Sequence, residues 1–141
     1  GTEKVGAIRA DLQKAMEADM QVFRTDETIR AALATIAELE ERYKNISIQD
    51  KGKRFNLDLL EAVELGFLIE LAKVMSVGAL HRKESRGGHY REDFPKRDDV
   101  NFMKHSMVYL DPESEFEGVK GLRFETKPVV YTRYEPKERK Y

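Results

Sequence analysis

Apolar side chains recur at steps of three and four residues along the first third of the chain, which is the spacing of helices with one buried face. Thr25 or Asp26 separates two such stripes and offers an N-cap for the second helix. The alternating steps of the second stripe are typical of helices that pack at a shallow angle, so the sequence predicts two antiparallel helices. The stripes comprise Val5, Ile8, Leu12, Met16, Met20 and Phe23, and then Ile29, Ala32, Ile36, Leu39, Tyr43 and Ile46.

A third helix is predicted from Leu57 to His81, after a polar linker at residues 50–54 and an N-cap at Asn56. Apolar residues surround much of its circumference, so it is expected to be the most buried helix, and two partner helices cover only part of its surface. The excess predicts a further contact, from the tail or from another domain. The residues in excess are Phe67, Leu68, Ile69, Val74, Met75, Val77 and Leu80.

Turn and strand formers replace this pattern in the last third of the chain. Gly87 or Gly88 is expected to supply the left-handed stop of the third helix. Residues 105–110 and 121–127 predict a β-hairpin, with turn chemistry at residues 111–114. Residues 128–131 are candidates to extend the hairpin, and residues 136–141 are expected to form an extended tail.

The expected fold is therefore mainly α. Residues 1–86 are expected to form a spectrin-like, up-down-up three-helix bundle. Residues 87–141 are expected to form a charged loop, a short β-hairpin and an extended tail that pack on the bundle as one structural unit.

Composition narrows the classes of function. The chain has 141 residues, a net charge of −1 and no cysteine, which favours one soluble domain and excludes disulfides, thiol nucleophiles and thiolate metal ligands. The balanced charge gives no long-range attraction for nucleic acid or anionic lipid. The third helix carries Asp58, Glu61, Glu64, Glu70 and Lys73, so it is not expected to cross a membrane. No secretory signal is visible at Gly1, and we expect a fragment of a longer protein.

Residues 84–99, which we call the charged loop, mix basic, acidic and aromatic side chains too densely for an ordinary helix end. Such a segment can be a solvated loop, an anion site or a docking surface. Arginine-rich loops of mixed sign often form fixed ion-pair networks across an interface, because guanidinium groups pair bidentately with carboxylates. A solvated surface loop remains open on these grounds alone.

Sequence tests for chemistry give little support for catalysis. Ser85, His89 and Asp93 would share a helix face, but Gly87 and Gly88 interrupt it and no nucleophile elbow is present. The three histidines, His81, His89 and His105, lack the spacing of a zinc site. No glycine-rich nucleotide motif occurs, and one Arg-Gly-Gly element is weak evidence for RNA binding.

The charged loop nevertheless resembles the C-terminal region of the succinate dehydrogenase and fumarate reductase flavoprotein subunit, in respiratory complex II. The residues that carry the resemblance lie at positions 84–95, 97–99 and 101–105, and the end of the family is echoed by Pro136, Arg139 and Tyr141. The sequence departs from the family at Gly88, where alanine is frequent, and at Phe102, where tryptophan is frequent.

The resemblance implies an oxidoreductase subunit that interconverts succinate and fumarate and passes electrons through iron–sulfur clusters to a quinone. It places the FAD, the dicarboxylate-binding residues and the proton-donating arginine in preceding domains, so no catalytic, cofactor-binding or metal residue is assigned here, and the fragment alone is expected to be inactive. The implied partners are the FAD-binding and capping domains of the same subunit and the iron–sulfur subunit, without nucleic acid or direct membrane insertion. The implied location is the cytoplasmic side of the bacterial inner membrane.

We hypothesise that the charged loop docks this module against the flavin-binding domain. The alternatives are an independent helical adaptor that engages a separate protein, and a single-stranded nucleic-acid binder. The residues assigned to docking are Ser85, Arg86, His89, Arg91, Glu92, Asp93, Arg97, Asp98 and Asp99.

Overall fold

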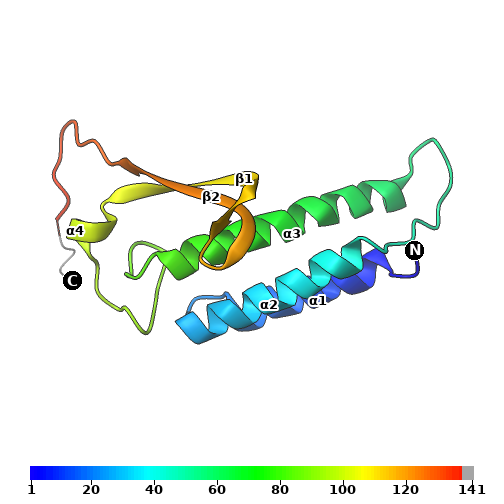
Figure 1. The fold of residues 1–141 in the computed structure, drawn as a ribbon, viewed down its shortest axis with the longest axis horizontal. Coiled ribbons are helices and arrows are strands. Elements are labelled where there is room, and N and C mark those ends of the chain that lie inside the picture. Colours follow the sequence, from blue (N-terminus) through cyan, green and yellow to red (C-terminus); the bar gives the residue numbers. More distant parts are fainter. Residues whose placement is uncertain (138–141) are drawn as a thin grey trace.

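Three long helices form an up-down-up bundle in the computed structural model, which describes residues 1–137 (Figure 1). They are α1 (Val5–Asp19), α2 (Asp26–Tyr43) and α3 (Leu57–His81), each antiparallel to the one before it. The bundle confirms the predicted mainly α fold. The elements that follow are the short helix α4 (Asp99–Phe102) and the strands β1 (Lys104–Phe116) and β2 (Val119–Pro128).

Side-chain caps start the second and third helices where the sequence predicts. Thr25 caps α2 by accepting a hydrogen bond from the Thr28 backbone N–H at 3.2 Å, and the Thr28 hydroxyl accepts the Thr25 N–H at 3.1 Å in return. Asn56 caps α3 by accepting the Leu59 N–H at 2.9 Å.

The first two helices end earlier than the apolar stripes suggest. Helix α1 stops at Asp19, so Phe23 leaves the core, is 66% exposed and instead meets the Tyr90 ring edge-on at 5.8 Å. Helix α2 stops at Tyr43, and Ile46 pairs its backbone with Glu3 instead. Periodicity alone did not locate these ends because Phe23 and Ile46 are apolar and in phase.

The core runs along the line where the three helices meet. Ile8 of α1, Ile36 of α2 and Leu65 of α3 are fully buried in its main cluster. Gly66 allows the close approach of α2 to α3, because a Cβ there would lie 2.6 Å from the Tyr43 hydroxyl oxygen. That hydroxyl donates to the Ala62 carbonyl at 2.9 Å, which fixes the spacing of the two helices.

The β-hairpin reverses at Glu117 and Gly118, which corrects the predicted turn at residues 111–114. Both residues have positive φ, 51° and 80°, as a two-residue type I′ turn requires. Asp111 does form turn-like hydrogen bonds, accepting from the Ser114 hydroxyl at 2.9 Å, but these make an irregularity inside β1. The turn chemistry was identified correctly, but it produces a bulge.

The hairpin lies along the C-terminal half of α3, and its turn reaches across α3 towards α2 (Figure 1). The ring of His81, the last residue of α3, lies tilted with its centroid 4.2 Å from that of Phe124, and it also contacts Phe116 and Phe102. Its Nδ1 lies 3.0 Å from a carboxylate oxygen of Glu117, at the tip of the hairpin. The hairpin therefore covers one end of the apolar helix.

The left-handed stop expected at Gly87 or Gly88 is also corrected. Helix α3 ends at His81, and its C-cap Arg82 has an extended backbone. Gly87 does have φ of 60°, but it lies in a tight turn in which Arg86 and His89 exchange backbone hydrogen bonds. Within residues 1–137 no helix combines the length and the apolar character that crossing a bilayer requires.

Candidate functional site

The charged loop begins at a buried carboxylate. Glu84 has no exposed surface and accepts hydrogen bonds from Arg82 at 2.6 Å, from Arg86 at 2.8 and 3.0 Å, and from the Asp98 backbone N–H at 2.8 Å. Burial alone raises the pKa of this carboxyl, but the hydrogen bonds from Arg86, Asp98 and Arg82 hold it below its ordinary value. Glu84 therefore stays ionised, and its carboxylate binds groups near both ends of the charged loop, Arg86 and Asp98.

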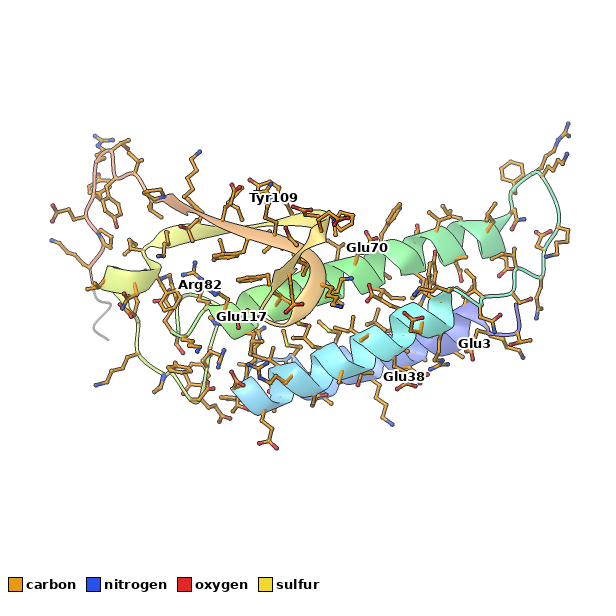
Figure 2. All side chains as sticks on the ribbon, viewed as in Figure 1. Glu3, Glu38, Glu70, Arg82, Tyr109 and Glu117 are labelled. Atoms are coloured by element: carbon orange, nitrogen blue, oxygen red, sulfur yellow. The ribbon has the colours of Figure 1, made fainter. Side chains whose placement is uncertain are left out.

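Arg82 connects the charged loop to the hairpin (Figure 2). Besides Glu84, its guanidinium donates to the carbonyl oxygens of Phe102 at 2.8 Å and Lys104 at 2.7 Å, and to the Ser106 hydroxyl at 3.0 Å. Because one planar group satisfies acceptors on three segments, it fixes β1 relative to the end of α3.

Arg91 is a fully buried guanidinium that joins the loop to two helices. It donates to the carbonyls of Ala79 at 2.9 Å and Leu80 at 3.1 Å, in the last turn of α3, and pairs bidentately with Asp93 at 2.7 and 2.6 Å. Asp93 in turn accepts the Asp26 backbone N–H at 2.9 Å, at the start of α2. The hydrogen bonds from Arg91 lower the pKa of Asp93 to about 2.

His89 is held as one tautomer between two arginines. Arg24 Nη1 lies 3.1 Å from His89 Nδ1, and since a guanidinium only donates, Nδ1 accepts. Nε2 then carries the proton and donates to the Arg82 carbonyl at 3.0 Å. Burial, together with the charges of Arg24, Arg91 and Arg82, lowers the pKa of His89, so the ring is neutral at pH 7.

Besides the charged loop, the surface carries an apolar face on α3 that no other described residue covers. Phe67, Leu71 and Met75 are 60%, 59% and 59% exposed. Ile69, Val77 and Leu80 from the predicted excess are buried in the bundle, whereas Phe67, Leu68 and Met75 are exposed. We define the α3 face as the exposed apolar residues that follow helical spacing, namely Leu60, Val63, Phe67, Leu71 and Met75.

Residues 9–141 match a family profile described as the C-terminal part of the fumarate reductase flavoprotein. The chain belongs to this family. It is 37% identical over 141 residues to the fumarate reductase flavoprotein subunit of Haemophilus influenzae, covering 100% of this chain and 22% of that protein. It is 42% identical over 135 residues to the 8-methylmenaquinol:fumarate reductase flavoprotein subunit of Wolinella succinogenes, covering 96% of this chain and 21% of that protein.

The fold agrees with the sequence match. A solved variant of the Escherichia coli quinol fumarate reductase subunit FrdA superposes with a TM-score of 0.88 and 37% identity, over 98% of this chain and 23% of that one. The chain thus spans less than a quarter of the length of these flavoprotein subunits. The resemblance stated from the charged loop is confirmed.

Most charged side chains of the charged loop bind other groups of the same chain. Asp99 pairs with Arg86 at 2.5 Å and Arg97 at 2.9 Å, and Asp98 caps α4 by accepting the Asn101 N–H at 3.0 Å. The Ser85 hydroxyl accepts the Arg91 N–H at 2.9 Å. These contacts show how the loop is built, while a role in docking to another domain stays a prediction.

Glu92, Asp93, Arg97 and Asp99 are the proposed docking residues that lie exposed. The Glu92 backbone donates to the Arg24 carbonyl at 2.9 Å, and its side chain is exposed. Arg97 is exposed beside Asp99.

Sequence reasoning missed Arg24, which contacts both His89 and the loop backbone. A lone arginine before the α2 cap was the only signal, and nothing in its spacing indicates a contact 65 residues away.

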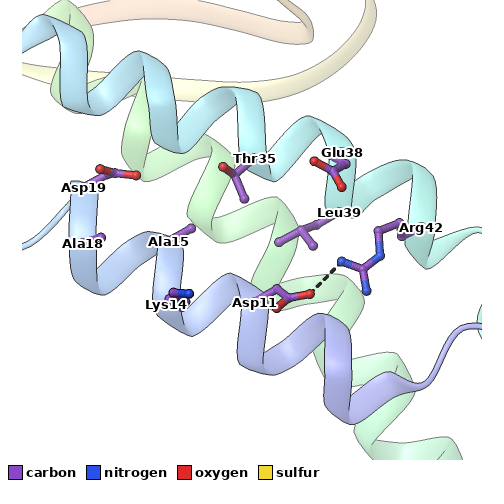
Figure 3. A pocket seen from close by; sticks show the side chains of 9 residues that line it. All are labelled: Asp11, Lys14, Ala15, Ala18, Asp19, Thr35, Glu38, Leu39 and Arg42. Atoms are coloured by element: carbon purple, nitrogen blue, oxygen red, sulfur yellow. Dashed lines mark hydrogen bonds and ion pairs between the residues drawn. The ribbon is translucent and has the colours of Figure 1, made fainter.

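A cavity of about 330 Å³ opens between α1 and α2, on the other side of the bundle (Figure 3). Arg42 lies at one end and pairs with Asp11 at 2.7 Å and with Glu3 at 3.0 Å. Because two carboxylates already compensate the guanidinium of Arg42, we assign this cluster a structural role. Within residues 1–137, no three His, Asp or Glu side chains lie close enough to hold a metal ion.

Proposed function

We propose that this chain is the docking module of an FAD-dependent flavoprotein subunit and supports succinate–fumarate interconversion without supplying a catalytic residue. The observation that carries the proposal is the α3 face, which is apolar, continuous and uncovered within the described residues. Five large apolar side chains on one helix face are costly to leave in water, at roughly 25 cal/mol for each Å² of apolar surface.

The occupant that fits is the remainder of the flavoprotein subunit. The relatives are more than four times as long as this chain, and the matched region lies in single polypeptides that continue beyond it. In this proposal FAD and the dicarboxylate bind in that remainder, and the iron–sulfur subunit and quinone receive the electrons at the cytoplasmic side of the membrane. The hydrophobic α3 face supplies affinity, and exposed charged-loop groups such as Glu92 and Arg97 fix the orientation.

The hydrogen bonding inside the charged loop supports the proposal that the α3 face supplies affinity and the loop fixes the orientation. Arg91 and Glu84 are buried and satisfied inside the module, so the module offers its partner a preorganised surface. Preorganisation lowers the entropy cost of association, which favours tight docking of a small module.

The test is a double substitution in the complete flavoprotein subunit, Phe67→Gln with Leu71→Gln. We expect loss of bound FAD and of succinate oxidation, because two polar side chains are then forced into an apolar interface. The matched control is Ala31→Gln, at an exposed position of α2, which should retain both. Wild-type flavin content and activity in the double variant would overturn the proposal and would favour the adaptor alternative.

A further inference from the structure

A small pocket lies at the C-terminal end of the α3 face. It has a volume of about 250 Å³, and its walls come from the segment after α1, the last turns of α3, the charged loop and β1. Met75 belongs both to the α3 face and to this pocket, and Gly78 and Arg82 continue along the same side of the helix at steps of three and four. The pocket is therefore continuous with the proposed docking surface.

The pocket contains a guanidinium without an acidic partner. Arg24 donates from Nε to the Met20 carbonyl at 3.0 Å and from Nη1 to His89 at 3.1 Å, and no carboxylate in residues 1–137 lies within ion-pair distance of it. Burial lowers the pKa of Arg24, as expected for a cation that lacks compensation. Four loop-associated arginines differ in this respect, since each pairs with a carboxylate; they are Arg82, Arg86, Arg91 and Arg97.

The surroundings hold Arg24 in place and keep the pocket positive. His89 accepts from Arg24 with its single lone pair, and its own proton is committed to the Arg82 carbonyl. The ring therefore positions the guanidinium without neutralising it. Glu84 compensates Arg82 and Asp93 compensates Arg91, so the uncompensated charge of this pocket is that of Arg24. A negatively charged group is the ligand that this pocket lacks.

Gly78 leaves the backbone of α3 open beside this pocket. A helix-interior glycine is less favourable than alanine by about 1 kcal/mol. At Gly66 the chain itself explains the glycine, because a Cβ would strike Tyr43. At Gly78 a Cβ would meet no atom within 4 Å in the described residues, so nothing within the module requires the missing side chain.

We propose that this pocket receives a carboxylate side chain from the remainder of the flavoprotein subunit, which pairs with Arg24 while its backbone passes over Gly78. The inference rests on the proposed function and names the polar anchor of that interface. The α3 face then supplies the apolar contact, and the Arg24 pocket fixes the register at one end of it. Arg24 thus acts as a positioning residue.

A zero-length carbodiimide crosslink tests the proposal in the complete subunit. The amine introduced by Arg24→Lys should couple to an Asp or Glu outside residues 1–141, and mass spectrometry of the peptides should identify that residue. The matched control is Arg30→Lys, which should couple to Asp26 within the module, because Arg30 pairs with Asp26 at 2.6 Å. Coupling of the first amine only within the module, or no coupling, overturns the proposal. A free dicarboxylate as the occupant would give that second result.

A glycine pair provides a second measurement that does not depend on Arg24. Gly78→Ala should stabilise the module but weaken docking, so that the complete subunit retains at most half of its FAD. Gly6→Ala, in the first turn of α1, also adds a Cβ that meets nothing and should leave FAD retention unchanged. Full FAD retention in Gly78→Ala overturns the close approach. If the Phe67 and Leu71 variant loses FAD while both pocket tests fail, the proposed function stands and the pocket assignment falls.

Discussion

Arg91 and Asp93 form a two-point ion pair, with Nε to Oδ1 at 2.7 Å and Nη2 to Oδ2 at 2.6 Å, across a single intervening residue. The pair has a partner on each side. Arg91 caps the Ala79 carbonyl at the end of α3, and Asp93 caps the Asp26 N–H at the start of α2. Because these two helix ends carry partial charges of opposite sign, one ion pair satisfies both.

Removal of the guanidinium should therefore strongly destabilise the chain. Arg91→Ala leaves the carbonyls of Ala79 and Leu80 without their donor, and each buried acceptor left unpaired costs about 1–3 kcal/mol. Urea unfolding should show a loss of that size in the free energy of unfolding. Arg30→Ala, which removes an exposed pair on α2, should change it by less than about 0.5 kcal/mol. A loss below about 1 kcal/mol for Arg91→Ala would contradict this role.

The same pair predicts sensitivity to acid. The pKa of Asp93 is about 2 in the folded chain against an ordinary 3.8, so folding favours the ionised form. The stabilisation is fully present above about pH 4 and is lost as the pH falls from about 4 towards 2. Because the carboxylate is partly exposed, we expect on the order of 1 kcal/mol from this group. Urea midpoints between pH 2 and 7 should show the loss, and Asp93→Asn should flatten that part of the profile.

The bundle could be predicted from sequence because its information is local. The starts of α2 and α3 each carry a side-chain cap, Thr25 and Asn56, next to a strong apolar period. The hairpin turn was misplaced for a related reason. Asp111 and its neighbours have turn chemistry, whereas Glu117 adopts positive φ only because the strand pairing on both sides requires it.

The candidate site was predictable in composition but not in connectivity. A dense mixture of charges in residues 84–99 indicated an ion-pair network, and Arg86 with Asp99 forms such a pair. No sequence rule pairs Arg24 with His89, which lies 65 residues away, because that contact depends on how α1 and α3 pack. The exposed α3 face was anticipated because too many apolar residues remained for two partner helices to cover.

The contact between Gly66 and Tyr43 predicts a steric effect. Gly66→Ala would place a Cβ 2.6 Å from the Tyr43 hydroxyl oxygen and 2.9 Å from the adjoining ring carbon. Overpacking of this kind costs about 1–3 kcal/mol, which outweighs the helix-propensity gain of about 1 kcal/mol. Thermal unfolding should show a lower midpoint for Gly66→Ala. The double variant with Tyr43→Phe should recover part of it, since the clashing oxygen is then absent, and an unchanged midpoint in Gly66→Ala would contradict the packing.

Ser76 offers the opposite kind of change, a substitution that should stabilise the chain. It is fully buried in α3, and its hydroxyl has no hydrogen-bond partner within the described residues. A buried unsatisfied hydroxyl costs about 1–3 kcal/mol, and alanine is also the better helix former. Ser76→Ala should therefore raise the free energy of unfolding by about 1 kcal/mol in urea titrations. Ala72→Ser, which adds a hydroxyl one turn earlier at another buried position, should lower it. A Ser76→Ala chain that is less stable than the parent would show that the hydroxyl has a partner.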